Sequence, residues 1–351
     1  MNSFQFNIFQ EINKSSIGKN MMISPISIYH ILSLTANGAK NKTLTEMLTA
    51  LCNKNKQEMN ENNKSISSAI GKFHTVEFAN AVFTKVKTEK TFKDAIKEYK
   101  AKVDRLQDAN QVNKWCSDAT HKKIPKIIDV ITPNDLIVLI NAIYFNGTWM
   151  NPFQKEKNTK NDFMNFNKEP KNVEFMNIKE PFPYFENEEY QAISLKYNKD
   201  SLSAIIILPQ KESDINNFIQ NFTYEKYNFI IKNAFQKKVA LSLPKFEINF
   251  EAEIKPNLMS LGMNNAFNDN ADFSDMYKGS KIYIGRVIHK TYIKVDEKGT
   301  KAAAATAVVM RMKGISIDPV MNVNHPFLFI IRADNLPAGH DILFISKVEC
   351  L

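Results

Sequence analysis

The stretch DEKGTKAAAATAVVMRMKGISIDPVMNVNHPF, residues 296–327, combines features that do not belong to one regular element. Its four consecutive alanines favour a helix, because alanine has the highest helix propensity. However, Gly299 precedes the alanines, and the β-branched residues Thr306, Val308 and Val309 follow them. The segment also lies between two strand-like runs. This mixture is typical of a segment that can change its conformation.

The same segment alternates with a period of two from Thr300 onward, as a strand with one buried face and one wet face does. The first face carries only small or apolar side chains and threonine: Thr300, Ala302, Ala304, Thr306, Val308 and Met310. The second face carries both charges: Gly299, Lys301, Ala303, Ala305, Val309 and Arg311. A permanently exposed loop does not need this pattern, whereas a loop that later becomes a strand does.

Apolar periodicity predicts mostly helices in the first third of the chain and strands in the last third. Ser24-Pro25 begins a long apolar helical run through Leu34. The segments 137–145, 203–209 and 239–250 are strand-like. The polar tract at 52–66 is typical of a solvated loop or a ragged helix. The predicted fold class is therefore α+β, with a large antiparallel or mixed sheet.

Composition describes a globular protein with a large core, because 44% of the 351 residues are hydrophobic. We see no flexible linker and no repeat, so we expect a single domain over residues 1–351. The formal net charge is +9, and only four of the 46 basic residues are arginines. The lysines are scattered along the chain rather than clustered, so we expect no nucleic-acid partner.

The three cysteines, Cys52, Cys116 and Cys350, form neither a disulfide framework nor a metal-binding spacing. We therefore expect no metal. No stretch approaches the ~20 apolar residues of a membrane span, so we expect no membrane partner. No basic region followed by a long apolar one opens the chain. We expect a cytoplasmic protein, or one released to the extracellular space without a signal peptide.

Catalytic motifs are missing from the sequence: it has no G-x-S-x-G elbow, no HExxH and no phosphate-binding loop. The six histidines are isolated. His289 could act as a base only with a nucleophile and an orienting carboxylate nearby, and a hydrogen-bonded core histidine is the simpler interpretation. We predict that the protein is not an enzyme and uses no cofactor.

At this point EKGTKAAAAT (297–306) resembles the hinge of the serpin family, and the resemblance extends in order over nearly the whole chain. Other segments similar to serpins are MMISPISIYHILSLTANGAKNKTLTEML (21–48), VNKWCSDATHKKIPKII (112–128), LINAIYFNGTWMNPF (139–153), LSLPKFEINF (241–250), LGMNNAFNDNADFSDM (261–276), HKTYIKVDEKGT (289–300) and NHPFLFII (324–331). The resemblance implies the serpin fold, with a large central β-sheet, further sheets, about nine helices and an exposed reactive-centre loop at about 297–320.

The resemblance also implies a role for individual residues. The hinge, which lets the loop enter the sheet, would be Glu297, Gly299, Thr300, Ala302, Ala303, Ala304, Ala305 and Thr306. The shutter, which controls opening of the sheet, would be Ser24, Ser27, Asn141 and His289. Trp149 would mark the breach, where the loop first enters. ILFISKVECL (342–351) departs slightly from the family, with Ile345-Ser346 where a Met-Gly-like pair is usual.

A serpin inhibitor is a suicide substrate, which a serine protease cleaves and with which it forms a covalent 1:1 complex. The reactive residue usually lies seventeenth, counting the hinge glutamate as the first, so the bond would be Lys313–Gly314. Lys313 suits a trypsin-like protease, or one that tolerates both basic and aromatic residues. Met312 is the neighbouring alternative and suits chymotrypsin-like or cathepsin-G-like pockets. Arg311 would require a loop that is two residues shorter.

Two other readings of the resemblance stay open. A non-inhibitory serpin would be cut without forming a covalent complex, and a cross-class inhibitor would trap papain-like cysteine proteases. The absence of charge and proline at Thr300, Ala302, Ala304 and Thr306 favours inhibition, because burying an unpaired charge costs several kcal/mol. We expect a monomer. The presumed polyanion-binding helix is short and not strongly basic, so a glycosaminoglycan partner is not expected.

Overall fold

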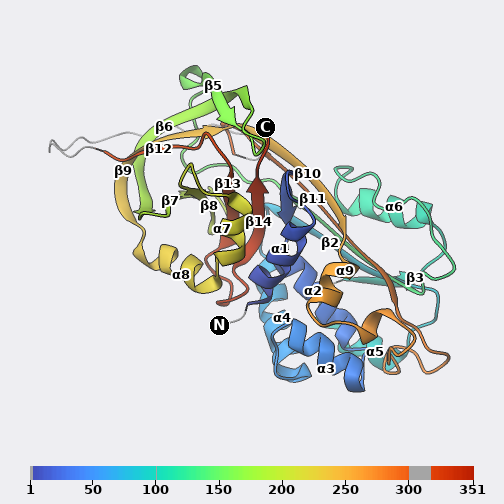
Figure 1. Ribbon diagram of the computed structural model, residues 1–351. Coiled ribbons are helices and arrows are strands. Elements are labelled where there is room, and N and C mark those ends of the chain that lie inside the picture. Colours follow the sequence, from blue (N-terminus) through green and yellow to red (C-terminus); the bar gives the residue numbers. More distant parts are fainter. Residues whose placement is uncertain (1–2, 100, 300–317) are drawn as a thin grey trace.

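The computed structural model describes residues 3–99, 101–299 and 318–351. Within these ranges the chain forms nine α-helices and two β-sheets (Figure 1). The α-helices are α1 (Phe4–Lys14), α2 (Pro25–Ala36), α3 (Asn41–Ala50), α4 (Lys56–Ile70), α5 (Lys90–Ala95), α6 (Ala109–Ala119), α7 (Ile215–Asn221), α8 (Tyr224–Asn233) and α9 (Lys255–Ser260). Short 3₁₀ helices are η1 (Lys97–Tyr99), η2 (Lys155–Lys157) and η3 (Asn265–Phe267).

The two sheets differ in their strand pairing. The five-stranded sheet has the order β10 (Phe246–Glu253), β11 (Ile284–Val295), β4 (Ile137–Phe145), β2 (Val76–Thr84) and β3 (Lys102–Arg105). The nine-stranded sheet has the order β1 (Met21–Ile23), β14 (Ile342–Val348), β13 (Phe327–Ala333), β8 (Leu202–Pro209), β7 (Tyr190–Lys196), β6 (Pro170–Glu186), β9 (Phe235–Pro244) and β12 (Val320–Asn322), with β5 (Thr159–Met164) paired to β6.

The main core cluster includes α1, α2 and strands of both sheets. Every residue of α2 is buried, as expected of a helix that is apolar all round, and Pro25 stands at its first turn behind the N-cap Ser24. Every residue of β4 is buried as well. On the other face of this sheet, α6 covers a smaller apolar cluster that includes Val112, Cys116 and Ile140. Figure 1 shows α6 on one side of the sheet and α1 and α2 on the other.

Secondary structure confirms the α+β class and most of the expected elements. The strand predicted over 239–250 is interrupted at Lys245 and continues in the other sheet, so β9 and β10 are separate strands. Of the two interpretations of the polar tract at 52–66, the helix is confirmed from Lys56 onward: α4 runs from Lys56 to Ile70, with the Asn55 side chain as its N-cap. With 15 residues α4 is not short, which corrects our expectation for this region. Its two lysines are balanced by two glutamates.

The segment between residues 299 and 318 connects the two sheets. β11 belongs to the five-stranded sheet and ends at Val295, whereas β12 belongs to the edge of the other sheet. β12 pairs with β9 in parallel, with Val320 opposite Ala240 and Asn322 opposite Ser242. Backbone hydrogen bonds from Ala240 N to Pro319 O and from Val323 N to Ser242 O hold the two ends of this short strand.

Candidate functional site: the sheet seam and the loop hinge

The central feature of the site is the pairing of β11 with β4. The two strands are parallel neighbours, with His289 opposite Asn141 and Tyr292 opposite Tyr144. We call this pairing the seam. Because the chain leaves the end of β11 into the segment after Gly299, a strand folded back from there would run antiparallel to both β11 and β4. A strand added in the seam would therefore lie next to the origin of that segment and run antiparallel to both of its neighbours.

The four predicted shutter residues meet at the middle of the seam. The backbone N–H of Ser24 donates to His289 Nε2 at 3.1 Å. Because Nε2 accepts, the ring proton lies on Nδ1, which faces Asn141 Oδ1. The Asn141 amide in turn donates to the Ser27 hydroxyl. The structure thus brings Ser24, Ser27, Asn141 and His289 into one hydrogen-bonded group, and all four are fully buried.

Burial also fixes the charge of His289. Desolvation lowers its pKa to about 3, so the ring is neutral near pH 7. Its Nε2 lone pair already accepts from Ser24, and Nδ1 faces an amide rather than a carboxylate. A neutral ring with both nitrogens engaged is a structural element of the seam and not a general base.

Sequence reasoning missed two members of this group. Asn80 in β2 lies opposite Asn141, accepts from its amide, and also accepts from Ser27 Oγ at 3.1 Å. Its amide lies 3.3 Å from His30 Nδ1. A signal was present in the sequence, because each of two apolar strands carries a single asparagine followed by alanine, at Asn80-Ala81 and Asn141-Ala142.

Trp149, the predicted breach residue, lies beside the end of β11. Its indole Nε1 donates to Asp296 O at 3.0 Å, and its backbone N donates to Lys298 O at 3.1 Å. Its ring stacks on Tyr197, with 4.5 Å between ring centroids and an interplanar angle of 16°. The tryptophan therefore holds the backbone of residues 296–298 against the body of the protein.

Glu297 is anchored by charge. Lys245 forms ion pairs with Glu297 and, at 2.8 Å, with Glu174, and the Asn158 amide donates to both carboxylates. Burial raises the pKa of Glu297, but the hydrogen bonds from Lys245 and Asn158 outweigh it, and the net pKa shift is downward. The pKa of Glu174 is lowered chiefly by its hydrogen bond to Lys245. Sequence analysis did not single out Lys245, Glu174 or Asn158.

The backbone conformation at position 299 requires glycine. Its φ is +117°, a conformation that side-chain-bearing residues rarely adopt, and a Cβ atom there would lie 2.4 Å from Gly147 O. Gly299 pairs with Thr148 and Asp296 through isolated bridges. The remaining predicted residues lie outside the described ranges: Thr300, Ala302, Ala303, Ala304, Ala305, Thr306, Arg311, Met312, Lys313 and Gly314.

Known proteins place this architecture in a family. A family model described as "Serpin (serine protease inhibitor)" matches residues 1–351. The chain belongs to the serpin family. Its relatives include the leukocyte elastase inhibitor of Xenopus laevis, 32% identical over 98% of this chain and 96% of the relative, and Serpin B8 of Homo sapiens, 31% identical over 94% and 93%. The thermophilic serpin tengpin in its native state has a TM-score of 0.88 at 33% identity, covering 99% of this chain and 92% of that one.

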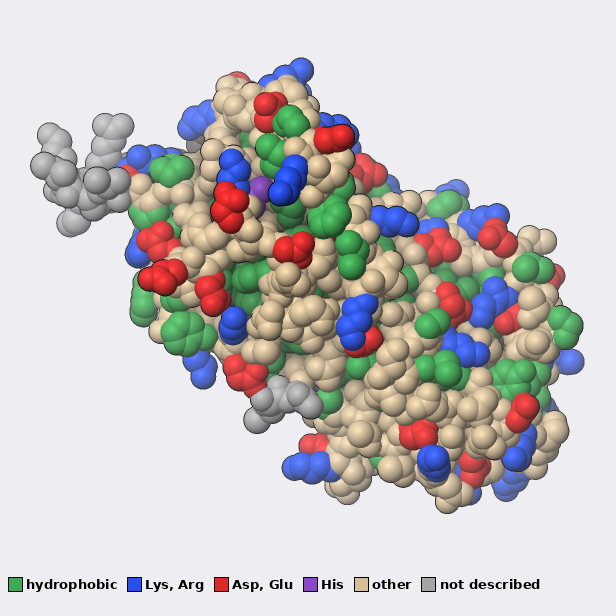
Figure 2. All heavy atoms as spheres, viewed as in Figure 1, with side chains coloured by type: hydrophobic (Ala, Val, Ile, Leu, Met, Phe, Trp, Pro, Cys, Tyr) green, Lys and Arg blue, Asp and Glu red, His purple; other side chains and the backbone are tan. Residues whose placement is uncertain are grey.

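Family membership settles the broad class of activity. Serpins are protease inhibitors and not enzymes, and this serpin is homologous to serine protease inhibitors. The roles assigned above to the hinge, shutter and breach residues stay predictions. No helix among the described residues has the length and apolar character that crossing a membrane requires. On the face seen in Figure 2, basic and acidic side chains are interspersed.

Proposed function

We propose that this serpin is a suicide-substrate inhibitor of serine endopeptidases. The protease serine attacks the carbonyl carbon of the reactive residue, which forms an ester and breaks the peptide bond. The leaving amine takes its proton from the catalytic histidine of the protease. The cut loop then inserts into the seam between β4 and β11 and carries the bound protease with it. Distortion of the protease active site stops hydrolysis of the ester.

The observation that carries this proposal is the closed, parallel seam directly beside the origin of the loop. An inserted strand would gain ladder hydrogen bonds on both of its sides. With about a dozen residues and ~1 kcal/mol net per bond, insertion releases on the order of 10–20 kcal/mol. The whole stability of a folded protease is roughly 5–15 kcal/mol, so this energy is enough to deform it. The uncut form is then a metastable, kinetically trapped state.

The hinge sequence supports insertion over simple cleavage. Thr300, Ala302, Ala304 and Thr306, which would face the protein interior after insertion, are small and uncharged. Lys301 falls on the opposite face and can stay hydrated. Gly299 and the Glu297 anchor would be the pivot about which the loop turns.

We propose Lys313–Gly314 as the reactive bond, with a trypsin-like protease as the partner in a covalent 1:1 complex. If the reactive residue is Met312 or Arg311, the preferred protease changes accordingly, with Met312 favouring a cathepsin-G-like pocket. We also propose that the serpin acts as a monomer and resides in the cytoplasm. A relative from Tachypleus tridentatus, 32% identical over 95% of this chain, carries the name "Intracellular coagulation inhibitor 2".

Incubation with trypsin and with cathepsin G, read by denaturing gel and mass spectrometry, tests the proposal. A band at the summed mass that survives denaturant, together with a C-terminal fragment beginning at Gly314, is the expected result. A fragment that begins at Lys313 would move the reactive residue to Met312. A Lys313→Ala variant should lose the trypsin complex, and Lys211→Ala, outside the loop, is its matched control.

Cleavage by both proteases without any covalent band would contradict inhibition of these two classes. Two functions would then remain, a cross-class inhibitor and a non-inhibitory serpin, and two measurements distinguish them. A complex with papain that reducing thiols dissolve would identify a cross-class inhibitor. Cleavage without any gain in melting temperature would identify a non-inhibitory serpin.

A further inference from the structure

The shutter's polar group does not end inside the sheet. From Asn80 it continues to His30 of α2, whose Nδ1 lies 3.3 Å from the Asn80 amide nitrogen. His30 Nε2 lies 3.1 Å from the hydroxyl of Ser67 in α4. The chain of contacts therefore runs from the seam across β4 and β2 to a helix on the outside of the sheet.

Hydrogen-bond direction along this chain is fixed by one backbone group. The Ser24 N–H can only donate, so His289 Nε2 accepts and Nδ1–H donates to Asn141. The Asn141 amide then donates to Asn80 Oδ1. This leaves the Asn80 amide group facing His30.

The last link follows from the same rule. Because Asn80 presents its N–H group, His30 Nδ1 must accept and carry no proton, so the ring proton sits on Nε2 and is donated to Ser67. Hydrogen bonds are therefore donated in one direction from His289 through Asn141 and Asn80 to His30. To reverse the bond at either histidine, the side-chain amides of both Asn141 and Asn80 would have to turn.

His30 differs from His289 in its access to solvent. It borders a surface cavity of about 250 Å³. The lining residues that bear on the argument are His30, Ser67, Glu77, Asn80 and Tyr99. His289 is completely buried at the seam. A proton can therefore reach His30, at the outer end of this series of hydrogen bonds, without any opening of the sheet.

We propose that His30 is a further positioning residue of the shutter, and that a proton arriving through this cavity loosens the seam between β4 and β11. The inference rests on the proposed function, because it concerns the opening that loop insertion requires. A proton on His30 Nδ1 would face the Asn80 amide, donor against donor. Relief requires Asn80 to turn its oxygen toward His30, which removes the acceptor that Asn141 uses.

Other groups around His30 do not oppose this response. The titratable groups that line the cavity are Tyr99 from η1 and Glu77 from β2, while α4 contributes the uncharged Ser67. None of the described lining residues is a lysine or an arginine. Burial lowers the pKa of His30 to about 4 and that of His289 to about 3, so His30 protonates first as the pH falls.

A synthetic peptide of residues 300–312, TKAAAATAVVMRM, with blocked ends and a pH-insensitive rhodamine label, serves as the probe for an open seam. It has no group that titrates between pH 4 and pH 7. We expect its rate of binding to the uncut serpin to rise roughly tenfold from pH 7 to pH 4, the scale of one or two net hydrogen bonds. His30→Gln keeps an acceptor and a donor but cannot be protonated, and its rate should change less than about twofold.

His121→Gln is the matched control. His121 is exposed and lies 3.4 Å from Glu77 at the wall of the same cavity, so its loss removes a neighbouring histidine without touching the polar chain. This variant should keep the full acid response. A flat wild-type profile, or an undiminished response in folded His30→Gln, would overturn the proposal.

If His30→Gln fails to fold, NMR titration of the wild-type histidine rings decides the matter. The His30 ring must then titrate in the pH range in which peptide binding accelerates, and at a higher pH than the His289 ring. Titration of His289 at a higher pH than His30 would overturn the proposal. Failure of the proposed function is a separate result. It shows as no covalent protease complex at neutral pH, where residue 30 is uncharged both as histidine and as glutamine.

Discussion

Lys245 holds two carboxylates that would otherwise repel each other at the start of the loop. Its ammonium group bridges Glu174 and Glu297, and Asn158 touches both. In Lys245→Ala the two carboxylates would face each other without a cation. We expect the hinge to loosen by about 1–2 kcal/mol, the size of lost hydrogen bonds to charged groups. At pH 7 this variant should polymerise faster on warming, as measured by native gel electrophoresis.

The matched control for Lys245 stands at the other end of the loop. Lys179 pairs with Asp318 at 3.0 Å but is about half exposed, and such surface pairs contribute little. Lys179→Ala should therefore behave as wild type. The pH dependence has a definite sign: the folded pKa of Glu297 is lowered, so the stabilisation is present above pH 4.5 and is lost as the pH falls through that folded pKa. A gap between the two variants that persists below this range would contradict the argument.

The sequence located several residues of the site but not the partners of others. Ser24, Asn141, His289 and Trp149 were located through short motifs in which neighbours along the chain are fixed. Lys245 and His30 could not be assigned their partners in this way, because those partners come from strands and helices far away in the chain. A period-two or helical pattern gives the face on which a side chain lies, but not the side chain it meets.

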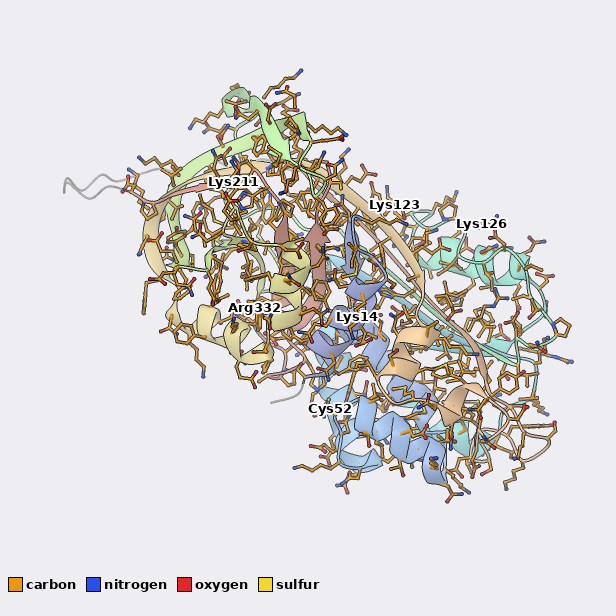
Figure 3. All side chains as sticks on the ribbon, in the orientation of Figure 1. Lys14, Cys52, Lys123, Lys126, Lys211 and Arg332 are labelled. Atoms are coloured by element: carbon orange, nitrogen blue, oxygen red, sulfur yellow. The ribbon has the colours of Figure 1, made fainter. Side chains whose placement is uncertain are left out.

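At the scale of the element, the seam carries an aromatic pair. Tyr144 and Tyr292 face each other across it, with ring centroids 6.2 Å apart, and Lys123 lies 5.9 Å above the Tyr144 ring. Figure 3 shows Lys123 in the segment that follows α6. An inserted strand would move β4 and β11 from about 4.8 Å to roughly 9.6 Å apart. The pair therefore exists only while the seam is closed.

Removing this pair should speed opening. We expect Tyr292→Val to bind the loop peptide about two- to tenfold faster than wild type, the range that a lost aromatic pair allows. Tyr292→Phe keeps the ring and should stay within about twofold. Stopped-flow fluorescence with the labelled peptide measures both rates. Equal rates for Tyr292→Val and wild type would show that the aromatic pair does not hold the seam.

Helices and strands could be predicted from the sequence where one face, or the whole element, is buried. β4 and α2 are apolar along their whole length, and the sequence indicated both. The boundary at Lys245 had a signal that the strand prediction over 239–250 did not use. The large apolar residues fall on odd positions up to Leu243 and on even positions from Phe246 onward, so the alternation shifts by one residue where the chain passes from one sheet to the other. α4 stayed ambiguous between a loop and a helix, because the segment is polar and only Met59, Asn63, Ile66 and Ser67 of the helix are buried.

For the whole molecule, cleavage of the loop should raise thermal stability. An insertion free energy of ~10–20 kcal/mol, divided by an unfolding entropy of roughly 0.7 kcal/mol per degree for a chain of this length, corresponds to a rise in melting temperature of about 15–30 °C. Differential scanning calorimetry before and after limited proteolysis at the loop measures it. An unchanged melting temperature would exclude insertion.

Acid should destabilise the molecule through its buried histidines. Burial lowers the pKa of His30 to about 4 and of His289 to about 3. Below pH 6.5 the unfolded chain binds protons that the folded chain does not, so stability falls from about pH 6.5 toward pH 4. Each histidine contributes a slope of ~1.4 kcal/mol per pH unit. Urea unfolding at pH 7.0, 5.5 and 4.5 tests this, and a stability that is constant over this range would contradict it.

The shortness of β12 has a consequence for how long the protein can be stored. The three residues of β12 pair with β9. In the proposed mechanism, the uncut loop could not insert along its whole length while this pairing holds. If β12 dissociates from β9 spontaneously, the uncut loop could insert, and the protein would lose its activity without contact with a protease. We therefore expect a slow loss of activity in storage, at a rate set by how often the three residue pairs between β12 and β9 separate.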